Sequence, residues 1–319
     1  MPNQFDVAIV GGGPAGLSAS LFLARYLHSV VLIDSGDPRN WETRGINAYL
    51  GLPAIKPAEL RERGRDEARK YDVELVDASV DRVRRITADD FVLTTDRAAY
   101  GARRVLLAIG LKDVWPDIPG LARAYGESAY VCPDCDGYEA RDKKTVVIGR
   151  GRKAVGMALN LSTWTKDIII CTNGESPDLD EAEYCQKLDG LNIPVLTDKV
   201  TCARVSRGHV YCLELANGMQ LDAERIFFAI GQYPADDLGA QLGCKRDEGG
   251  HIAVDAHGHT SVPNVYAAGD IIPGPQLAIA AAADGAIAAL AIHKSLVPEE
   301  QKLEPISNAA STSAASSRA

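Results

Sequence analysis

The chain has 319 residues, of which 46% are hydrophobic, so it can bury a substantial core, and its length predicts two domains rather than one. The formal net charge of −9 argues against a nucleic-acid partner, because affinity for phosphate backbones comes mainly from clustered Lys and Arg. Composition and charge together predict a soluble, acidic enzyme.

We expect neither a signal peptide nor a membrane span. Asp6 interrupts the first residues, which lack the cationic and apolar succession of a signal peptide. The longest apolar stretch, Leu277 to Ile292, is expected to be too short to cross a bilayer, and it contains Asp284. We therefore expect a cytoplasmic location, where scattered cysteines are most often buried and inert.

The chain begins with the pattern of a dinucleotide-binding unit. Its predicted parts are a strand, a G-x-G-x-x-G turn, a helix and a second strand, at Phe5–Val10, Gly11–Gly16, Leu17–Leu27 and Ser29–Ile33. Gly11 permits the tight turn, Gly13 lets the backbone approach a pyrophosphate, and Gly16 lets helix and strand pack closely. The helix N-terminus favours phosphate charge, and Asp34 would accept a hydrogen bond from a ribose hydroxyl. The alternative is a glycine-rich turn in an unrelated α/β protein.

Loops, one helix and several strands complete this first unit. The loops at 37–40 and 47–53 could lie along the nucleotide. A charged helix is predicted at Glu59–Lys70, where acidic and basic residues pair on a solvated face. Further strands are predicted at Val73–Val76, Val80–Ile86, Phe91–Thr94 and Arg104–Ile109.

Two cysteines with redox spacing form the most distinctive motif. Cys132 and Cys135 are separated by two residues, and Asp136 follows at once. A zinc site would need two further ligands, and the histidines at 251, 257 and 259 have no cysteine near them, so no metal is expected. A structural disulfide is disfavoured in the cytoplasm, which leaves redox chemistry. Asp136 can exchange protons with the thiols if burial raises its pKa, and the alternative is a surface acid in a turn.

A second nucleotide-type unit follows the cysteines. Its predicted strand, glycine turn, helix and second strand lie at Thr145–Ile148, Gly149–Ala154, 155–161 and Asp167–Cys171. Ala108-Ile109-Gly110 closes the first unit and Ala229-Ile230-Gly231 closes the second, so the two units form an internal repeat.

The last ordered segment is assigned back to the first domain. A buried strand is predicted to end at Gly269 and Asp270, and an Ala-rich helix to start near Gln276. The expected fold is α/β, with two Rossmann-like, three-layer ββα nucleotide-binding domains, the second inserted in the first. The predicted ranges are 1–113 with 246–303 for the first domain, 114–245 for the second, and 304–319 for a Ser/Ala-rich tail typical of disorder.

These motifs, in this order, resemble the low-molecular-weight thioredoxin reductases over essentially the whole chain except the tail. The resemblance implies FAD in the first domain, an NAD(P)H-type second domain, a homodimer, and domains that rotate relative to each other. It implies that Cys135 exchanges electrons with the flavin, that Cys132 attacks the substrate disulfide, and that Asp136 acts as acid or base. The implied cofactor contacts are Gly11, Gly13, Pro14, Ala15, Gly16, Asp34, Asn40, Asn47, Ala108, Gly110, Gly269, Asp270, Gln276 and Leu277.

The second unit departs from the family pattern. NADPH-using members carry H-R-R-x-x-x-R after its second strand, which grips the 2′-phosphate. This chain has Thr172 to Asp178 there, and no basic residue lies between Asp167 and Gln186. A 2′-phosphate would meet like charge, and Cys171 and Thr172 leave no strand-end acid for NAD. Arg150, Arg152 and Lys153 in the glycine turn could hold some other phosphate, or simply be exposed. We therefore expect that NADPH is not the donor.

The sequence then resembles the pyridine-nucleotide-independent branch of the family, in which ferredoxin or another flavin supplies electrons. A second flavin could stack on Tyr49, Tyr138 or Tyr233, although ordinary packing is an alternative for each. The expected substrate is a thioredoxin-like or small-molecule disulfide or dithiol.

Three alternatives stay open. The loop 37–40 is similar to that of thioredoxin-reductase-like dithiol oxidases, which pass electrons to oxygen but usually carry His where Asp136 stands. An ordinary NADPH-dependent thioredoxin reductase is the second. The third is a non-catalytic flavoprotein, which the intact Cys132 to Asp136 motif disfavours.

Overall fold

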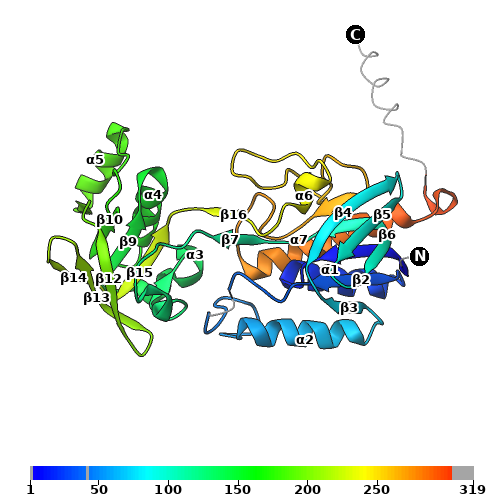
Figure 1. Ribbon diagram of the computed structural model, residues 1–319, viewed down its shortest axis with the longest axis horizontal. Helices are drawn as coiled ribbons and strands as arrows, with labels where there is room; N and C mark the ends of the chain where they lie inside the picture. Colours follow the sequence, from blue (N-terminus) through cyan, green and yellow to red (C-terminus); the bar gives the residue numbers. More distant parts are fainter. Residues whose placement is uncertain (1–2, 41–42, 304–319) are drawn as a thin grey trace, which may run out of the picture.

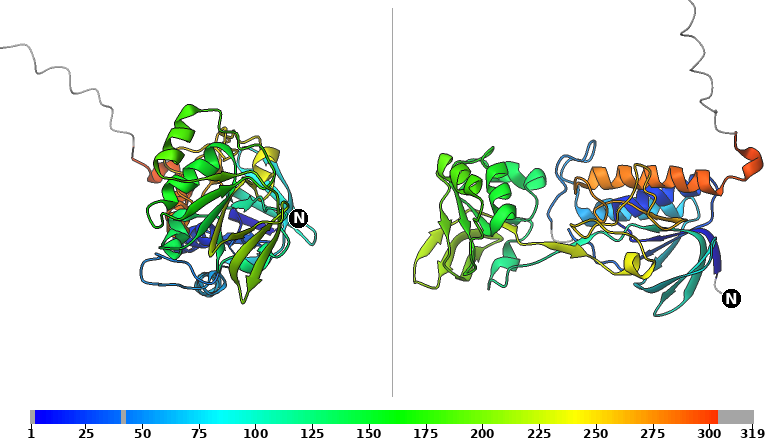
Figure 2. Two further views of the ribbon diagram at one scale, coloured as in Figure 1. Left: turned by 90° about the vertical axis from the view of Figure 1, so that its left-hand side faces the viewer. Right: turned by 90° about the horizontal axis from the view of Figure 1, so that it is seen from above.

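The computed structural model describes residues 3–40 and 43–303, so the predicted tail at 304–319 lies outside the described residues. Two lobes are joined by a pair of extended connections (Figure 1). The first lobe contains both the beginning of the chain and its last helix, and the second lobe is formed by the middle of the chain. The views from the side and from above show the same division (Figure 2).

A mixed seven-stranded sheet forms the centre of the first lobe. Its strands are β1 (Asn3–Val10), β2 (Val30–Asp34), β3 (Glu74–Asp77), β4 (Val80–Thr87), β5 (Asp90–Thr95), β6 (Ala99–Leu107) and β17 (Val265–Ala267). The order is β3-β2-β1-β6-β5-β4, and β17 pairs in parallel with the end of β6. The last segment of the chain thereby joins the sheet that the first segment begins.

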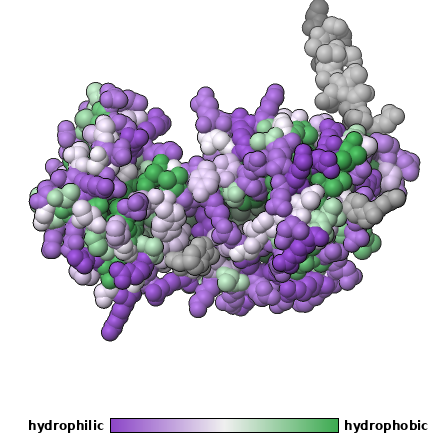
Figure 3. Space-filling view, in the orientation of Figure 1, coloured by the Kyte–Doolittle hydropathy of each residue, from purple (hydrophilic) through white to green (hydrophobic). Residues whose placement is uncertain are grey.

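The sheet separates two cores. Successive side chains of a strand point to opposite faces, so Val7 and Ile9 of β1 pack on the helical side and Ala8 and Val10 on the other. The helical side carries α1 (Pro14–Arg25), α2 (Pro57–Arg69) and α7 (Ala278–Leu296). The lower edge of this lobe, where α2 lies, is covered by hydrophilic residues (Figure 3).

Helix α1 begins earlier than predicted, at Pro14 rather than Leu17, and ends at Arg25 rather than Leu27. Proline is well suited to the first helical position because its missing N–H has no helical partner there. Leu27 has a φ of 65°, a left-handed conformation that a helix cannot continue through. The glycine turn therefore leads directly into the helix.

Helix α7 is longer than the predicted apolar stretch. It has 19 residues, and a stretch of 18 of them has a mean hydropathy of 1.3, so the expectation that this segment is too short to cross a bilayer was wrong on length. One face of α7 nevertheless packs in the core beside α1, through Ala281, Ala288 and Ile292. The two helices approach so closely that a Cβ at Gly285 would lie 2.0 Å from the carbonyl oxygen of Ala15.

The second lobe repeats the strand and helix arrangement on a smaller scale. A five-stranded parallel sheet has the order β11-β10-β9-β15-β8, and a three-stranded antiparallel sheet has the order β12-β13-β14. The strands are β8 (Ala129–Tyr130), β9 (Thr145–Gly149), β10 (Ile168–Cys171), β11 (Val195–Leu196), β12 (Val200–Ser206), β13 (His209–Leu215), β14 (Gln220–Asp222) and β15 (Arg225–Ala229). The helices are η1 (Leu121–Ala124), α3 (Pro133–Asp136), η2 (Gly137–Ala140), α4 (Gly151–Leu161) and α5 (Ala182–Gly190).

The connections between the lobes pair with each other. Strand β7 (Leu111–Asp113) leads out of the first lobe, β16 (Gln232–Pro234) leads back, and the two run antiparallel. Each follows one of the Ala-Ile-Gly turns that the sequence repeat identified. The remaining short helices are α6 (Leu238–Gln241) and η3 (Glu299–Gln301).

The chain returns to the first lobe earlier than the predicted boundary at 245/246. Leu238 of α6 is buried in the same core as Val83 of β4. Gln241 accepts a hydrogen bond from the Val83 N–H at 3.0 Å and donates to the Asp81 carbonyl at 3.2 Å. The segment after Pro234 therefore packs on the first sheet, because its apolar residues are needed there to cover β4.

Candidate functional site

The first glycine turn forms one wall of a cavity. Gly11 has a φ of +106°, and a Cβ there would lie 2.2 Å from the carbonyl oxygen of Ala108. Gly16 lies under Gly11, since a Cβ at Gly16 would meet the Gly11 carbonyl oxygen at 1.9 Å. Gly13 is different, because its Cβ position has no neighbour within 4 Å among the described residues and opens to the cavity.

Two helices direct their N-termini at this cavity. Gly13 precedes α1 and Leu277 precedes α7, and neither has a polar side chain that could cap its helix. Both residues, with Ala15 and Ala278, line the cavity. Unpaired N–H groups and helix dipoles favour negative charge at both points.

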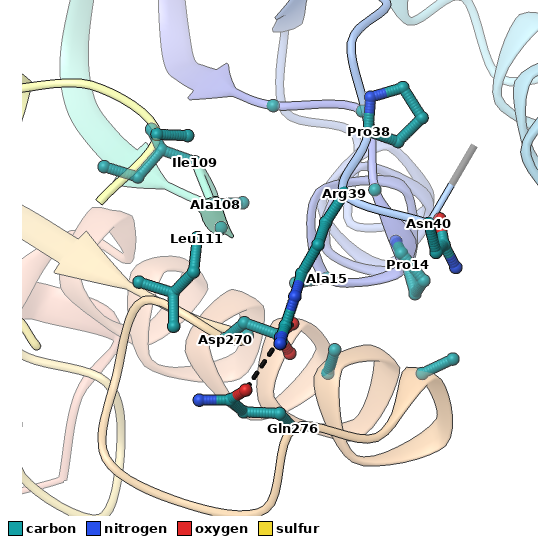
Figure 4. Close-up of a pocket in the computed structure, with 18 of the residues that line it drawn as sticks. Pro14, Ala15, Pro38, Arg39, Asn40, Ala108, Ile109, Leu111, Asp270 and Gln276 are labelled. Atoms are coloured by element: carbon teal, nitrogen blue, oxygen red, sulfur yellow. Dashed lines mark hydrogen bonds and ion pairs between the residues drawn. The ribbon is translucent and has the colours of Figure 1, made fainter. Parts of the chain in front are cut away.

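The cavity has a volume of about 540 Å³. It is lined by thirteen of the fourteen predicted cofactor residues, Gly16 being the one that lies behind the turn. The lining predicted residues are Gly11, Gly13, Pro14, Ala15, Asp34, Asn40, Asn47, Ala108, Gly110, Gly269, Asp270, Gln276 and Leu277. Segments far apart in the sequence thus converge here, and Figure 4 shows part of this wall.

Asp34 is engaged by the charged helix α2. The Nη2 atom of Arg61 lies 2.6 Å from Oδ2 of Asp34, and Nη1 of Arg65 lies 3.8 Å from the same oxygen. The Nε atom of Arg61 is buried without a hydrogen-bond partner among the described residues, and Arg61 also lines the cavity. Asp34, the carboxylate predicted to bind the ribose, is therefore ion-paired with an arginine of the helix that was predicted to present a solvated face.

Arg39 is the functional residue that sequence reasoning missed most clearly. Its guanidinium extends into the cavity and donates to Gln276 Oε1 at 2.7 Å (Figure 4). It also lies 3.3 Å from Asp270 Oδ2 and makes a two-bond pair with Asp113. Burial raises the pKa of Asp270, and the charge of Arg39 opposes that rise. The loop 37–40 was expected along the nucleotide, but an arginine in a loop carries no periodic signal, so no role was predicted for Arg39 itself.

The cysteine pair lines the same cavity as the glycine turn. Cys132 and Cys135 are joined as a disulfide, with their Cα atoms 5.3 Å apart. Cys132 is the N-cap of α3, and the Cys135 N–H donates to Cys132 Sγ at 3.2 Å. This donor would stabilise a negative charge on Cys132 when the disulfide is open.

Asp136 has an environment that favours its protonated form. Burial raises the pKa of Asp136 to about 7, with a further contribution from the charge of Glu139. Asn47 from the first lobe donates to Asp136 Oδ1 at 3.5 Å, which opposes the rise. A carboxyl with a pKa near neutrality that lines the same cavity as the disulfide can give and take a proton during thiol chemistry.

The second glycine turn is covered by the chain itself. The Gly151 N–H donates to the Pro177 carbonyl at 2.9 Å, and a Cβ at Gly151 would lie 3.5 Å from Asp178 Cβ. Arg150 faces the acids of this segment, with Nη1 3.6 Å from Glu175 and 3.4 Å from Asp178. The turn before α4 thus differs from the open turn before α1.

Of the three tyrosines considered for flavin stacking, Tyr49 lines the cavity. Tyr138 and Tyr233 are 65% and 53% exposed, and neither is among the described residues that line the cavity.

The open glycine cradle, the two helix N-termini and the orphaned Arg61 donor fit a dinucleotide such as FAD, with the disulfide in the wall of the same cavity. Fold and site together define a disulfide oxidoreductase of the two-domain flavoprotein type.

The chain belongs to the pyridine nucleotide-disulphide oxidoreductase family, whose sequence model matches residues 5–285. A probable thioredoxin reductase of Arthroderma benhamiae is 30% identical over 300 residues, which cover 84% of this chain and 74% of that protein. Three other curated relatives are matched over only 54 to 59% of their own length. The family comprises FAD-binding flavoproteins, and this chain is a thioredoxin reductase-like enzyme of it that acts on sulfur groups.

Solved structures agree with this assignment. The crystal structure of HlmI has a TM-score of 0.86 and 34% identity, with 92% of this chain and 93% of that chain covered. The putative thioredoxin reductase TrxB from Bacillus anthracis has a TM-score of 0.84 and 32% identity, with coverages of 91% and 98%.

Proposed function

We propose that this enzyme passes electrons between FAD in the cavity, the Cys132–Cys135 pair and a dithiol or disulfide substrate, without NADPH. The observation that carries this proposal is the contrast between the two glycine turns. The turn at Gly13 opens to a cavity that the disulfide also lines, whereas the turn at Gly151 is covered by an acidic segment of the chain.

The chain's own residues support each chemical step. Bound FAD would supply two-electron oxidation and reduction. When Cys132–Cys135 receives two electrons, its S–S bond breaks and both sulfurs become available for protons, one of which Asp136 can supply. The Cys132 thiolate, stabilised by the Cys135 N–H, then attacks a substrate disulfide and forms a mixed disulfide, releasing one substrate sulfur. Cys135 attacks Cys132, releases the second substrate sulfur and re-forms the original disulfide.

Electrostatics in the second lobe argue against NADPH. A 2′-phosphate near Glu175 and Asp178 would be repelled, and Arg150 is already paired with both acids. The Gly151 N–H that would face a pyrophosphate donates to Pro177 instead. Ferredoxin or a second flavin beside Tyr49 is the donor that we propose, and a thioredoxin-like protein or small disulfide in the cytoplasm is the proposed acceptor.

A homodimer is part of the proposal. The outer face of α7 carries a stripe at helical spacing in which Ile279, Ile287 and Leu290 are 41%, 41% and 39% exposed. Apolar side chains arranged in this way are typical of an interface between subunits.

An anaerobic titration tests the electron donor. The flavin absorbance of the FAD-loaded protein would be followed with NADPH, NADH, reduced ferredoxin and a small dithiol as separate donors. We expect bleaching with ferredoxin or dithiol and none with stoichiometric NADPH. Rapid bleaching by NADPH would contradict the proposal and identify an ordinary NADPH-dependent reductase instead.

A dithiol oxidase is the second candidate. The observation that favours it is that the loop 37–40, on which the resemblance to such oxidases rests, supplies Arg39 to the cavity. In this case a small dithiol would give its two electrons and two protons to the enzyme, and O₂ would take them up as H₂O₂. Oxygen-dependent turnover of the dithiol, with no transfer to thioredoxin, would establish this function.

A further inference from the structure

Arg39 joins the flavin cavity to the connections between the lobes. Its Nε and Nη2 atoms donate to the two carboxylate oxygens of Asp113 at 2.6 and 2.7 Å. Asp113 is the last residue of β7, the strand that leads into the second lobe. The third nitrogen, Nη1, donates to Gln276 and Asp270 on the cavity wall. One guanidinium therefore contacts both the cavity wall and an interlobe strand.

Strand β16, which leads back to the first lobe, is bonded to Asp113 and Gln276 as well. Gln232, the first residue of β16, donates to Asp113 Oδ1 at 3.2 Å and accepts from Gln276 Nε2 at 2.9 Å. Lys112 of β7 donates to the Asp37 carbonyl at 3.0 Å, two residues before Arg39. Strand β7 is thus bonded to the loop 37–40, and β16 is bonded to Gln276 and to Asp113 of β7.

The ion pair between Arg39 and Asp113 is buried. The side chains of Arg39 and Asp113 are only 15% and 6% exposed, so water competes little for their hydrogen bonds. The paired donors of a guanidinium match a carboxylate in a fixed plane, which a lysine ammonium cannot do. An exposed ion pair would tolerate reorientation of the strand, whereas this buried two-bond pair restricts it.

The Arg39–Asp113 ion pair restricts the second lobe to an orientation in which Cys132 and Cys135 line the cavity. Asn47, from the loop that follows, reaches the second lobe and donates to Asp136 beside Cys135. Tyr125 of the second lobe donates through its hydroxyl to the Arg39 carbonyl at 3.4 Å. The same stretch of the first lobe therefore contacts the strands between the lobes and the surroundings of the disulfide.

We propose that Arg39 is a positioning residue that fixes both interlobe strands to the cavity wall and so holds the Cys132–Cys135 pair against the flavin cavity. It acts through Asp113 and Gln276 and takes no part in the thiol chemistry itself. The inference rests on the proposed function only in treating this cysteine pair as the reactive centre.

The test compares Arg39→Gln and Arg39→Lys with Arg63→Gln in the FAD-loaded protein. Arg63 lies on α2, is 60% exposed and pairs only with Glu59 among the described residues, so it controls for loss of an arginine. The protein is reduced anaerobically with a phosphine, and the alkylation rates of Cys132 and Cys135 are measured by mass spectrometry. Cys185, an exposed free cysteine on the second lobe, serves as the internal reference.

We expect both Arg39 variants to raise the alkylation rate of the pair relative to Cys185, about tenfold for Arg39→Gln, because the lobe becomes free to turn the thiols toward solvent. Amide hydrogen exchange in 111–113 and 232–234 should rise in the same variants, and Arg63→Gln should match the wild type. Arg39→Lys keeps the charge, so it provides the test if Arg39→Gln does not fold.

Unchanged relative alkylation in a folded, FAD-containing Arg39 variant would overturn the inference, even if strand exchange increased, because Arg39 would then have only a structural role. Neither readout uses turnover or a biological electron donor, because the phosphine opens the disulfide directly. Bleaching by NADPH together with raised alkylation would refute the proposed function and leave the role of Arg39 intact.

Discussion

At the scale of single residues, Asp136 shows how position changes the chemistry of a side chain. In the sequence it is one of two acids in a four-residue helix, and Asp134 beside it is exposed. The fold encloses Asp136 between Glu139 and the cavity, which raises its pKa to about 7. The motif therefore contains one acid that can exchange protons at neutral pH and a second, Asp134, that is exposed at the cavity wall.

Replacing Asp136 by Asn should slow disulfide exchange by about 10²- to 10⁴-fold, because a positioned proton donor is lost. In the wild type, the rate of the step that needs the protonated carboxyl should fall as pH rises through about 7. Stopped-flow rates of substrate reduction across pH 5 to 9 (roughly the range over which such a group titrates) would measure both effects. Asp134→Asn is the matched control and should keep the wild-type profile.

The same pKa has a consequence for stability. Because folding raises the pKa from 3.8 to about 7, the native state binds a proton more tightly than the unfolded chain between these values. The free energy of unfolding should therefore decrease as pH rises through this window, and Asp136→Asn should remove that decrease. Denaturant midpoints measured across this pH window check it, and an identical pH dependence in both proteins would show that Asp136 is ionised throughout.

At the scale of secondary-structure elements, α7 has two faces with separate roles. Ala281, Ala288 and Ile292 pack on α1, while Ile279, Ile287 and Leu290 remain exposed. The helix N-terminus also reaches the cavity through Ala278. An interface on the outer face would therefore adjoin the cofactor site.

Ile287→Glu should convert the proposed dimer into a monomer, because a buried, unpaired carboxylate opposes association. Light scattering after size exclusion would give the mass, to be compared with the 34.1 kDa chain. Ile86→Glu is the matched control, since Ile86 is 53% exposed on β4, away from the helical layer. A dimer that survives Ile287→Glu would place the interface elsewhere.

Element boundaries were predictable where local chemistry decides them. The continuous apolar run Val7–Val10 of β1 and the glycine turn after it are local signals, and the observed strand and turn follow them. The early return of the chain at Leu238 was not predictable, because a four-residue helix has too little periodicity to show which core it will join. The hydrogen bond from the Gly151 N–H to Pro177 was also not predictable, because the loop 172–178 has no sequence pattern that indicates where it packs.

At the scale of the whole molecule, each lobe has its own cores and the cavity draws on both lobes. Two clusters lie on the faces of the first sheet and two in the second lobe. A cofactor in the cavity would therefore stabilise the first lobe directly, through its glycine turn and helix termini, and would contact the second lobe at the wall that carries the disulfide.

Removing FAD should lower the thermal stability of the first lobe more than that of the second. A ligand at about 1,000 times its dissociation constant contributes about 4 kcal/mol to the state that binds it. Calorimetry of the apo and FAD-loaded protein should show one transition that rises with FAD and one that moves less. A thermogram that FAD does not shift would contradict binding to the folded state.

The sequence by itself indicated the class of enzyme, because glycine spacing, the cysteine pair and short apolar strand segments are local patterns that a printed chain displays. It also shows that no basic residue lies between Asp167 and Gln186, and the proposal about NADPH starts from this observation. Only the tertiary structure showed that Arg39 pairs with Asp113 of β7, that Arg61 pairs with Asp34, and that the Gly151 N–H donates to the Pro177 carbonyl. These depend on contacts between distant segments, where a single charged or polar side chain acquires its role from the partners that folding brings to it.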